Sequence, residues 1–245
     1  MTRLSVNLNK FALVRNSRDG DFPDLLHAAQ VVINSGCDGL TLHPRADARH
    51  ATLDDVLRFG QLESVRNGMV ELNVEGDLRP ELMRTAKYAG ARQFTVVPVI
   101  PGEKTSSRGW RAYDDQQALK DAIAFFGGKT RISVFCDATM HSVDLAASAG
   151  ADAVEFYTGE YARQFHTPQA EVILAGIAEA AERARAHGMQ IHGGHDLDTE
   201  NLPRYLQTVK TEEVSIGHAI TSEALFRGLD GVLKDYLAVI REYGG

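Results

Sequence analysis

The stretch Ser148-Ala149-Gly150-Ala151-Asp152-Ala153-Val154-Glu155-Phe156 carries the pattern that decides the fold prediction. A helical pattern ends at its glycine, and apolar strand formers follow after a short turn. Glycine supplies the left-handed residue that ends a helix without a Cβ penalty. The same pattern recurs at residues 34–42, 88–97 and 185–192. Several of the strands that follow are largely apolar, as expected when both faces of a parallel sheet are covered.

Strand and helix patterns alternate along the whole chain. Strands are predicted near residues 4–8, 38–43, 69–75, 93–98, 131–136, 152–157, 189–193 and 213–217. Helices are predicted near residues 24–35, 53–66, 80–89, 112–126, 139–149, 168–187, 198–209 and 221–242. About eight units of roughly thirty residues have the size of a (βα)₈ TIM barrel, so we predict a single-domain α/β barrel over residues 1–245. An open doubly wound sheet is the alternative, but no Gly-x-Gly-x-x-Gly follows the first strand.

Composition narrows the classes of partner. The chain has 245 residues and a formal net charge of −7, without a run of Lys and Arg, so no nucleic acid is expected as partner. A phosphorylated metabolite stays possible, because it needs only one or two local basic groups. Cys37 and Cys136 lack metal-ligand spacing and are expected to be buried free thiols in a reducing cytosol. No segment resembles a signal peptide or approaches the ~20 apolar residues of a membrane span, so we expect a cytoplasmic protein without a membrane partner.

Polar side chains gather at the C-terminal ends of the predicted strands, where a barrel forms its active site. The loop His43-Pro44-Arg45-Ala46-Asp47-Ala48-Arg49-His50 places two histidines and two arginines between a strand and a helix. Imidazole moves protons near neutral pH, and guanidinium grips phosphate with two parallel hydrogen bonds. Other strand ends contribute Asn7, Asn9, Lys10, Glu75, Glu155, His195, Asp196 and His218. This set predicts proton-transfer chemistry on a phosphorylated small molecule.

Each of these groups also has a simpler interpretation. Alternation places Glu71 and Glu75 on one strand face, and such carboxylates alternatively pair with nearby Arg or Lys, because an unpaired buried charge is costly. A metal could collect the histidines and carboxylates, but no His-Glu-x-x-His or similar spacing occurs, so no metal is predicted. Phosphate could lie on the backbone N–H groups of Gly193-Gly194 and Gly217, with bidentate contacts from arginines. Tight turns are the other role for these glycines.

Short motifs along nearly the whole chain resemble those of the pyridoxine 5′-phosphate synthase family. The resemblance rests on Arg15-Asn16-Ser17-Arg18 with Pro23-Asp24, His43-x-Arg45 with Arg49-His50, Asn73-x-Glu75, Glu155-x-x-Thr158-Gly159-x-Tyr161-Ala162, Gly194-His195, and Ile216-Gly217-His218-Ala219-Ile220. Members of that family are (βα)₈ barrels that condense 1-deoxy-D-xylulose 5-phosphate with 3-amino-2-oxopropyl phosphate. The reaction releases phosphate and water and needs no cofactor.

The resemblance implies a role for each matching residue. His43 and Glu75 match proton acceptors, His195 matches the proton donor, and Glu155 matches a carboxylate that stabilises the transition state. The residues that would hold the deoxyxylulose phosphate are Asn9, Lys10, Arg45, His50 and Thr105. Those that would hold the amino-oxopropyl phosphate are Asn7, Arg18, Asp196, Gly217 and His218. The family also implies a homo-oligomer, and the apolar stripe over residues 225–240 could either close the barrel or pack on a partner.

Three departures from the usual family motifs leave alternatives open. Asn9-Lys10 replaces Asp-His, Asp196 replaces a glycine after the donor histidine, and His-Pro-Arg replaces His-Leu-Arg. We interpret them as marks of an Asn-Lys and His-Pro-Arg sub-type, with a relative that condenses or cyclises different keto or amino-keto substrates as the alternative. A non-catalytic barrel that binds a phosphometabolite is a third hypothesis. Lys10 could also form a Schiff base with a ketone if it is neutral, although a protonated lysine that holds the substrate is the simpler role.

Overall fold

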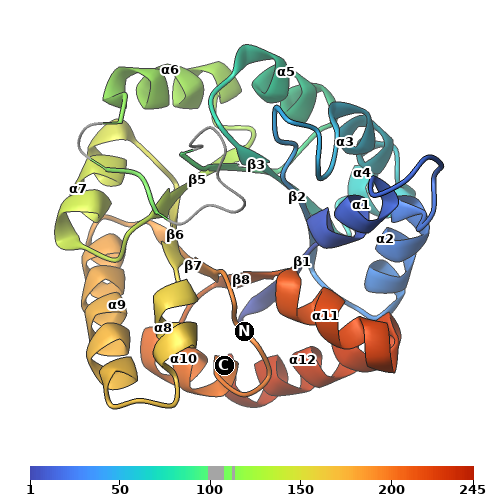
Figure 1. Ribbon diagram of the computed structural model, residues 1–245. Helices are drawn as coiled ribbons and strands as arrows, with labels where there is room; N and C mark the ends of the chain where they lie inside the picture. Colours follow the sequence, from blue (N-terminus) through green and yellow to red (C-terminus); the bar gives the residue numbers. More distant parts are fainter. Residues whose placement is uncertain (99–107, 112–113) are drawn as a thin grey trace.

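The structure is a closed barrel of eight parallel strands surrounded by helices (Figure 1). This computed structural model describes residues 1–98, 108–111 and 114–245. The strands are β1 (Arg3–Asn7), β2 (Gly39–Leu42), β3 (Glu71–Gly76), β4 (Gln93–Val96), β5 (Arg131–Cys136), β6 (Ala153–Tyr157), β7 (Gln190–Gly194) and β8 (Glu213–Ile216). Barrel closure comes from the pairing of β8 with β1, in which Arg3 lies opposite Glu213. The predicted (βα)₈ architecture is confirmed, and the open sheet is ruled out.

The helices follow the strands in the order expected for this fold. They are α1 (Asn9–Arg15), α2 (Leu25–Asn34), α3 (Leu53–Gly60), α4 (Glu63–Arg66), α5 (Pro80–Tyr88), α6 (Gln116–Phe126), α7 (Met140–Ala149), α8 (Gly159–Gln164), α9 (Gln169–Ala186), α10 (Leu202–Val209), α11 (His218–Arg227) and α12 (Leu229–Tyr243). Gly150 ends α7 in the left-handed conformation, with φ 91°. The stretch 148–156 therefore ends a helix at its glycine and continues into a strand, as the sequence predicts.

Two short helices were not predicted, and both matter for the site. The chain turns directly from β1 into α1 and from β6 into α8, where the sequence suggested only strand ends. Neither helix has a side-chain N-cap, and each spans at most two turns, so neither carries a periodic apolar signal. The predicted helix over 221–242 is also two helices, separated at Gly228 with φ 77°.

That break divides the apolar stripe of the C-terminal segment. Val232, Leu233 and Leu237 on α12 are buried within the chain, so this part closes the barrel. Leu225 and Phe226 on α11 are 73% and 89% exposed. One half of the stripe therefore packs inside the chain and the other half faces outward, and packing on a partner stays a prediction.

The barrel strands point polar side chains inward and apolar side chains toward the helices. Ser5 and Thr41 hydroxyls lie 2.7 Å apart inside the barrel, and Asn73 donates to Thr41 and accepts from Thr95. The apolar core lies between strands and helices and includes Leu4, Val6, Leu40, Leu42, Leu72, Val74 and Phe94. Side chains that continue the inward rows to the C-terminal strand ends therefore reach the barrel mouth.

Two further observations bear on the expectations from composition. Cys37 and Cys136 are buried and form no disulfide. Across residues 1–98, 108–111 and 114–245, no helix has the length and apolar character needed to cross a bilayer.

Candidate active site

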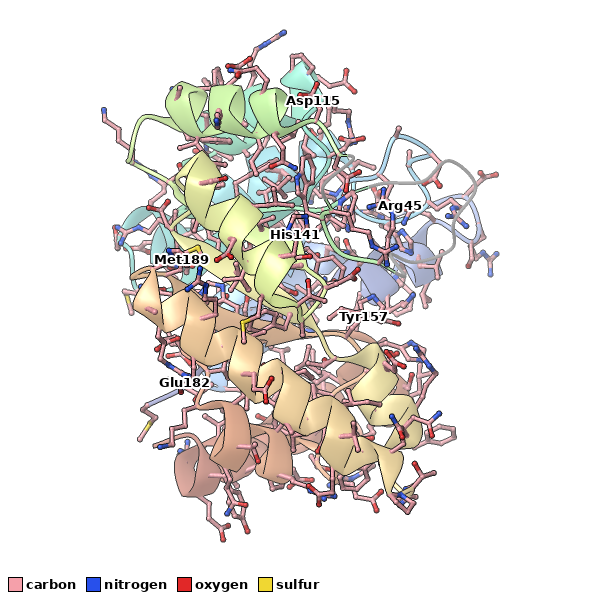
Figure 2. The ribbon with its side chains drawn as sticks, turned by 90° about the vertical axis from the view of Figure 1, so that its left-hand side faces the viewer. Arg45, Asp115, His141, Tyr157, Glu182 and Met189 are labelled. Atoms are coloured by element: carbon pink, nitrogen blue, oxygen red, sulfur yellow. The ribbon has the colours of Figure 1, made fainter. Side chains whose placement is uncertain are left out.

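A pocket of about 460 Å³ lies at the C-terminal ends of the barrel strands. Figure 2 shows Arg45 and Tyr157 at this end of the barrel, and Met189, which precedes β7, toward the other. The predicted site residues that line the pocket are Asn7, Asn9, Lys10, His43, Arg45, His50, Glu75, Glu155, His195, Asp196, Gly217 and His218. Arg18 is exposed and lies outside the lining, and Thr105 falls outside the described residues. The fold thus brings together residues spread over most of the chain.

A chain of side-chain contacts fixes His43 and Glu75. Asn7 Oδ1 accepts from the backbone N–H of Asn9 (3.0 Å), and Asn9 Oδ1 accepts from that of His43 (2.9 Å). Asn7 Nδ2 and Ser215 Oγ donate to the two oxygens of Glu75, at 3.3 and 3.4 Å. His43 Nδ1 lies 3.7 Å from Glu75 Oε2. The buried Nε2 of His43 has no hydrogen-bond partner within the part of the chain that the structure describes.

Burial moves the pKa values of this pair toward useful chemistry. Desolvation, with the nearby charges of Arg45, His50 and Arg79, lowers the pKa of His43 to about 3. Desolvation also raises the pKa of Glu75 to about 7, against the hydrogen bond from Ser215. At neutral pH the imidazole is therefore an uncharged base, and the carboxyl group is close to half ionised. A carboxyl group that titrates near neutral pH, as Glu75 does, can accept and return a proton.

Glu155 is the second buried carboxyl group of the mouth. Its pKa lies well above the ordinary value because of burial and because of the negative charges of Glu75 and Glu213. Two buried carboxyl groups that lie close together resist simultaneous ionisation. A Cβ atom at Gly194 would overlap Glu155 Oε1, so the glycine at this strand end leaves space for the carboxyl group in its present position. The predicted cradle for phosphate at Gly193-Gly194 stays a prediction.

Positive charge dominates the rim near β2. Arg45 and Arg49 both face Asp47, with Nε to Oδ2 distances of 3.9 and 2.8 Å. Burial and the neighbouring charges of Lys10, Arg45 and Arg49 lower the pKa of His50 to about 4. Burial lowers the pKa of Lys10 as well, while Asp196 opposes this effect. Such an excess of cations suits an anionic ligand.

Two of the residues in the motif 15–18 brace this rim. Arg15 makes a two-pronged ion pair with Asp55, at 2.6 and 2.8 Å, and thereby ties α1 to the capping box of α3. Asn16 Nδ2 donates to the carbonyl oxygen of His50 at 2.7 Å and lies within hydrogen-bond distance of those of Ala48 and Arg49. These residues hold the His43–His50 loop in place.

His195 sits on a constrained turn after β7. Its φ is 91° and that of Asp196 is 58°, both in the left-handed region that side chains other than glycine seldom adopt. Thr158 Oγ1 lies 2.7 and 2.6 Å from the carbonyl oxygens of Gly194 and His195. Asn201 Nδ2 donates to the carbonyl oxygen of Asp196 at 3.2 Å. Non-glycine residues held in this way mark positions where the surrounding structure enforces the backbone.

The structure also adds residues that sequence reasoning missed. Phe135, Arg163 and Ser215 line the pocket, as does Tyr157, which the sequence showed only as a strand end. Arg163 lies on α8, one residue beyond the quoted motif that ends at Ala162, and the unpredicted helix is what turns it toward the mouth. Inward alternation along β5 and β8 was the available signal for Phe135 and Ser215. Among the described residues, no group of three or more His, Cys, Asp or Glu side chains is arranged to hold a metal.

Fold and site together define a (βα)₈ barrel with a buried acid–base set and a cationic rim, as in barrel enzymes that act on anionic small molecules. A family model described as pyridoxal phosphate biosynthesis protein PdxJ matches residues 4–242, and the chain belongs to this family. It is 42% identical to the pyridoxine 5′-phosphate synthase of Xanthomonas axonopodis pv. citri, over 98% of this chain and 97% of that protein. The corresponding protein of Cytophaga hutchinsonii is 38% identical over 99% of this chain and its own full length. The family resemblance drawn from the short motifs is confirmed.

Solved structures of lower identity support the fold alone. Phosphoribosyl anthranilate isomerase from Thermotoga maritima superposes with a TM-score of 0.64 at 12% identity, covering 99% of this chain and all of that one. Tryptophan synthase from Mycobacterium tuberculosis gives a TM-score of 0.66 at 16% identity, covering 98% of this chain and 93% of that one.

Proposed function

We propose that this protein is a pyridoxine 5′-phosphate synthase, which condenses 1-deoxy-D-xylulose 5-phosphate with 3-amino-2-oxopropyl phosphate and releases phosphate and water. The observation that carries the proposal is the pairing of neutral His43 with Glu75, whose pKa is about 7, in a pocket with a cationic rim. Imine formation, loss of water and ring closure each require a proton to move. A carboxyl group that titrates near neutral pH beside an uncharged imidazole can take part in such proton transfers.

The family roles supply the assignment of catalytic groups. His43 and Glu75 act as proton acceptors, and Glu75 Oε2 lies 3.7 Å from His43 Nδ1. His195 acts as the proton donor from the opposite side of the mouth. Glu155 stabilises the transition state. Its buried position beside other acids disfavours the ionised carboxylate, and this form becomes more favourable as positive charge develops next to it.

Two sets of residues hold the substrates in this proposal. Asn9, Lys10, Arg45, His50 and Thr105 bind the deoxyxylulose phosphate, for which the cationic rim near β2 is suited. Asn7, Arg18, Asp196, Gly217 and His218 bind the amino-oxopropyl phosphate. Gly217 precedes the first turn of α11, whose backbone N–H groups and positive dipole end favour an anion.

The protein is further proposed to be a cytoplasmic homo-oligomer. Buried, unpaired Cys37 and Cys136 suit a reducing compartment. Large apolar side chains stand exposed on and near α1 and α11, and they are Leu13, Val14, Phe22, Leu225 and Phe226. A second copy of the chain would cover such side chains.

One assay tests the proposed reaction directly. Purified protein is incubated with both substrates, without added metal or cofactor, and pyridoxine 5′-phosphate is sought by mass spectrometry. Product formation that His195→Ala abolishes supports the proposal. Folded protein that turns over only other keto-phosphates points to a divergent relative. Binding of either phosphate with no turnover of any tested ketone indicates a barrel that only binds a phosphometabolite.

A further inference from the structure

His195 rests against an aromatic platform formed by Phe135 and Tyr157. The ring centroids of Tyr157 and His195 are 5.0 Å apart and their planes meet at 68°, an edge-to-face contact. Phe135 lies 5.9 Å from Tyr157 and 6.2 Å from His195. Edge-to-face pairs at these distances are attractive beyond the area that they bury. The imidazole of His195 is therefore packed against the ring of Tyr157.

Tyr157 is itself held from two directions by α8. Its hydroxyl accepts a hydrogen bond of 2.9 Å from Arg163 Nη1, and the guanidinium carbon lies 5.8 Å from the ring centroid. At the start of α8, a Cβ atom on Gly159 would come within 2.6–2.8 Å of the outer phenol atoms. The ring thus fits against a glycine on one side and is tied to an arginine at its tip.

The polar side of His195 faces a carboxylate. Asp196 Oδ2 lies 3.6 Å from His195 Nδ1, and the interaction with this imidazole is the main cause of the lowered pKa of Asp196. The charges of His218 and Arg163 lower it further. His195 is consequently bounded by a ring on one side and a carboxylate on the other, on a backbone in the left-handed region.

We propose that Arg163 and Tyr157 are positioning residues for His195: Arg163 fixes the Tyr157 hydroxyl, and the Tyr157 ring sets the orientation of the imidazole that donates the proton. The inference rests on the proposed function of His195. It differs from a substrate-binding role for Arg163, because in this arrangement the guanidinium acts through the phenol. A displaced catalytic group costs turnover more than substrate affinity.

Steady-state kinetics distinguish these two roles. Tyr157→Phe and Arg163→Met each remove the same hydrogen bond, so each lowers kcat by about three- to tenfold, and the double variant loses no more than either one. Tyr157→Leu removes the ring and lowers kcat by roughly ten- to a hundredfold. The KM for each substrate stays within about twofold. Arg183→Met, which alters an exposed arginine on α9 far from the pocket, is the matched control with unchanged kinetics.

A spectroscopic measurement tests the contact without any turnover. The Cε1–H signal of His195, assigned by its loss in His195→Gln, is recorded by NMR in the ligand-free protein. Loss of the Tyr157 ring current in Tyr157→Leu shifts this signal, whereas Arg183→Met leaves it in place. If the wild-type protein makes no pyridoxine 5′-phosphate, the proposed reaction fails, and this signal still decides whether Tyr157 positions His195.

Three results overturn the inference. A raised KM for one phosphate substrate with unchanged kcat in Arg163→Met makes Arg163 a phosphate ligand. Multiplicative losses in the double variant show that Arg163 and Tyr157 act separately. An unmoved His195 signal in folded Tyr157→Leu shows that the ring does not set the imidazole position.

Discussion

The two ends of the barrel interior use the same residue type in opposite ways. At the N-terminal end, Glu71 pairs with Arg131 at 2.7 Å and Glu213 pairs with Arg3 at 3.1 Å. Burial raises the pKa of Glu213, and Arg3 and Arg131 act against that rise. At the mouth, Glu75 and Glu155 have no arginine or lysine partner within the described residues. Glu71 and Glu75 lie on one face of β3, only four residues apart.

This difference separates a carboxylate in an ion pair from a proposed catalytic carboxyl group within one strand. A neighbouring cation acts to lower the pKa of a buried carboxyl group, whereas burial without such a cation raises it. The simpler interpretation, in which barrel carboxylates pair with Arg or Lys, is correct for Glu71 and wrong for Glu75 and Glu155 as far as the described residues extend. The presence or absence of a neighbouring cation, rather than the residue type, distinguishes the glutamates at the N-terminal strand ends from those at the mouth.

Of the variants that probe this comparison, Glu75→Gln should have the largest effect on kcat. It removes a carboxyl group at the mouth that lacks an arginine or lysine partner among the described residues. If Glu75 is the proton acceptor proposed above, its loss lowers kcat roughly 10²- to 10⁴-fold. The substitution also removes a buried carboxyl group whose ionisation destabilises the folded state. Because the pKa of Glu75 is raised from 4.5 to about 7 on folding, wild-type stability falls as pH rises between those values. The variant should therefore have the higher melting temperature at pH 8, and the difference should vanish toward pH 4.5. A lower melting temperature at pH 8 would contradict this account.

Arg131→Met should do the reverse at the N-terminal end. It leaves Glu71 without its salt bridge and removes a charge that counteracts the raised pKa of Glu213. Because this pair is only partly buried, its loss should cost less than the roughly 3–5 kcal/mol typical of a fully buried pair. Melting temperature should drop by roughly 2–4 °C for each kcal/mol, while kcat of the remaining folded protein stays within about threefold. Thermal unfolding and kinetics on one preparation compare the two. Large loss of kcat at full stability would show that the two ends are not separate.

The pH profile should carry the signature of the unpaired carboxyl group. Glu75 must be ionised to accept a proton, and its pKa is about 7. The rate constant kcat/KM should therefore fall about tenfold for each pH unit below that value. Burial lowers the pKa of His43 to about 3, so this imidazole stays uncharged throughout and adds no step above pH 5. A profile that is flat from pH 8 to 5.5 would remove Glu75 from the role of base.

The fold was readable from the sequence because its signals are local. Gly150 ends a helix, and Asp24, Thr52 and Thr139 cap three others through side-chain hydrogen bonds, as their residue types predict. Alternation placed Glu71, Asn73 and Glu75 on one face, and the hydrogen bonds of Asn73 inside the barrel confirm it. The missed helices α1 and α8 carry no such cap, so only tertiary contacts such as Arg15 with Asp55 define them.

The site was readable in its composition but not in its contacts. Strand ends and family motifs gave His43, Glu75, Glu155 and His195 together, because barrel topology brings strand ends to one face. Which carboxylates lack a cation depends on Arg3 and Arg131, which come from strands distant in sequence. Arg163 was missed because its helix, α8, is short and has no periodic apolar pattern that would predict it from the sequence.

Lys10 gives the smallest expected effect and extends the comparison from carboxylates to cations. It lies at the mouth of the barrel, whereas Arg3 and Arg131 lie at the N-terminal ends of their strands. Arg3 and Arg131 are neutralised by carboxylates, whereas Lys10 shares a half-buried rim with Arg45 and Arg49, opposed only in part by Asp196. A lysine in that position has charge to offer a phosphate. Lys10→Met should therefore raise KM for one phosphate substrate about tenfold and change kcat less than about threefold. Borohydride treatment with a keto-phosphate, followed by peptide mapping, should leave Lys10 unmodified. An adduct on Lys10 with a collapse in kcat would instead give the lysine a covalent role, because its lowered pKa would then supply the neutral amine that a Schiff base requires.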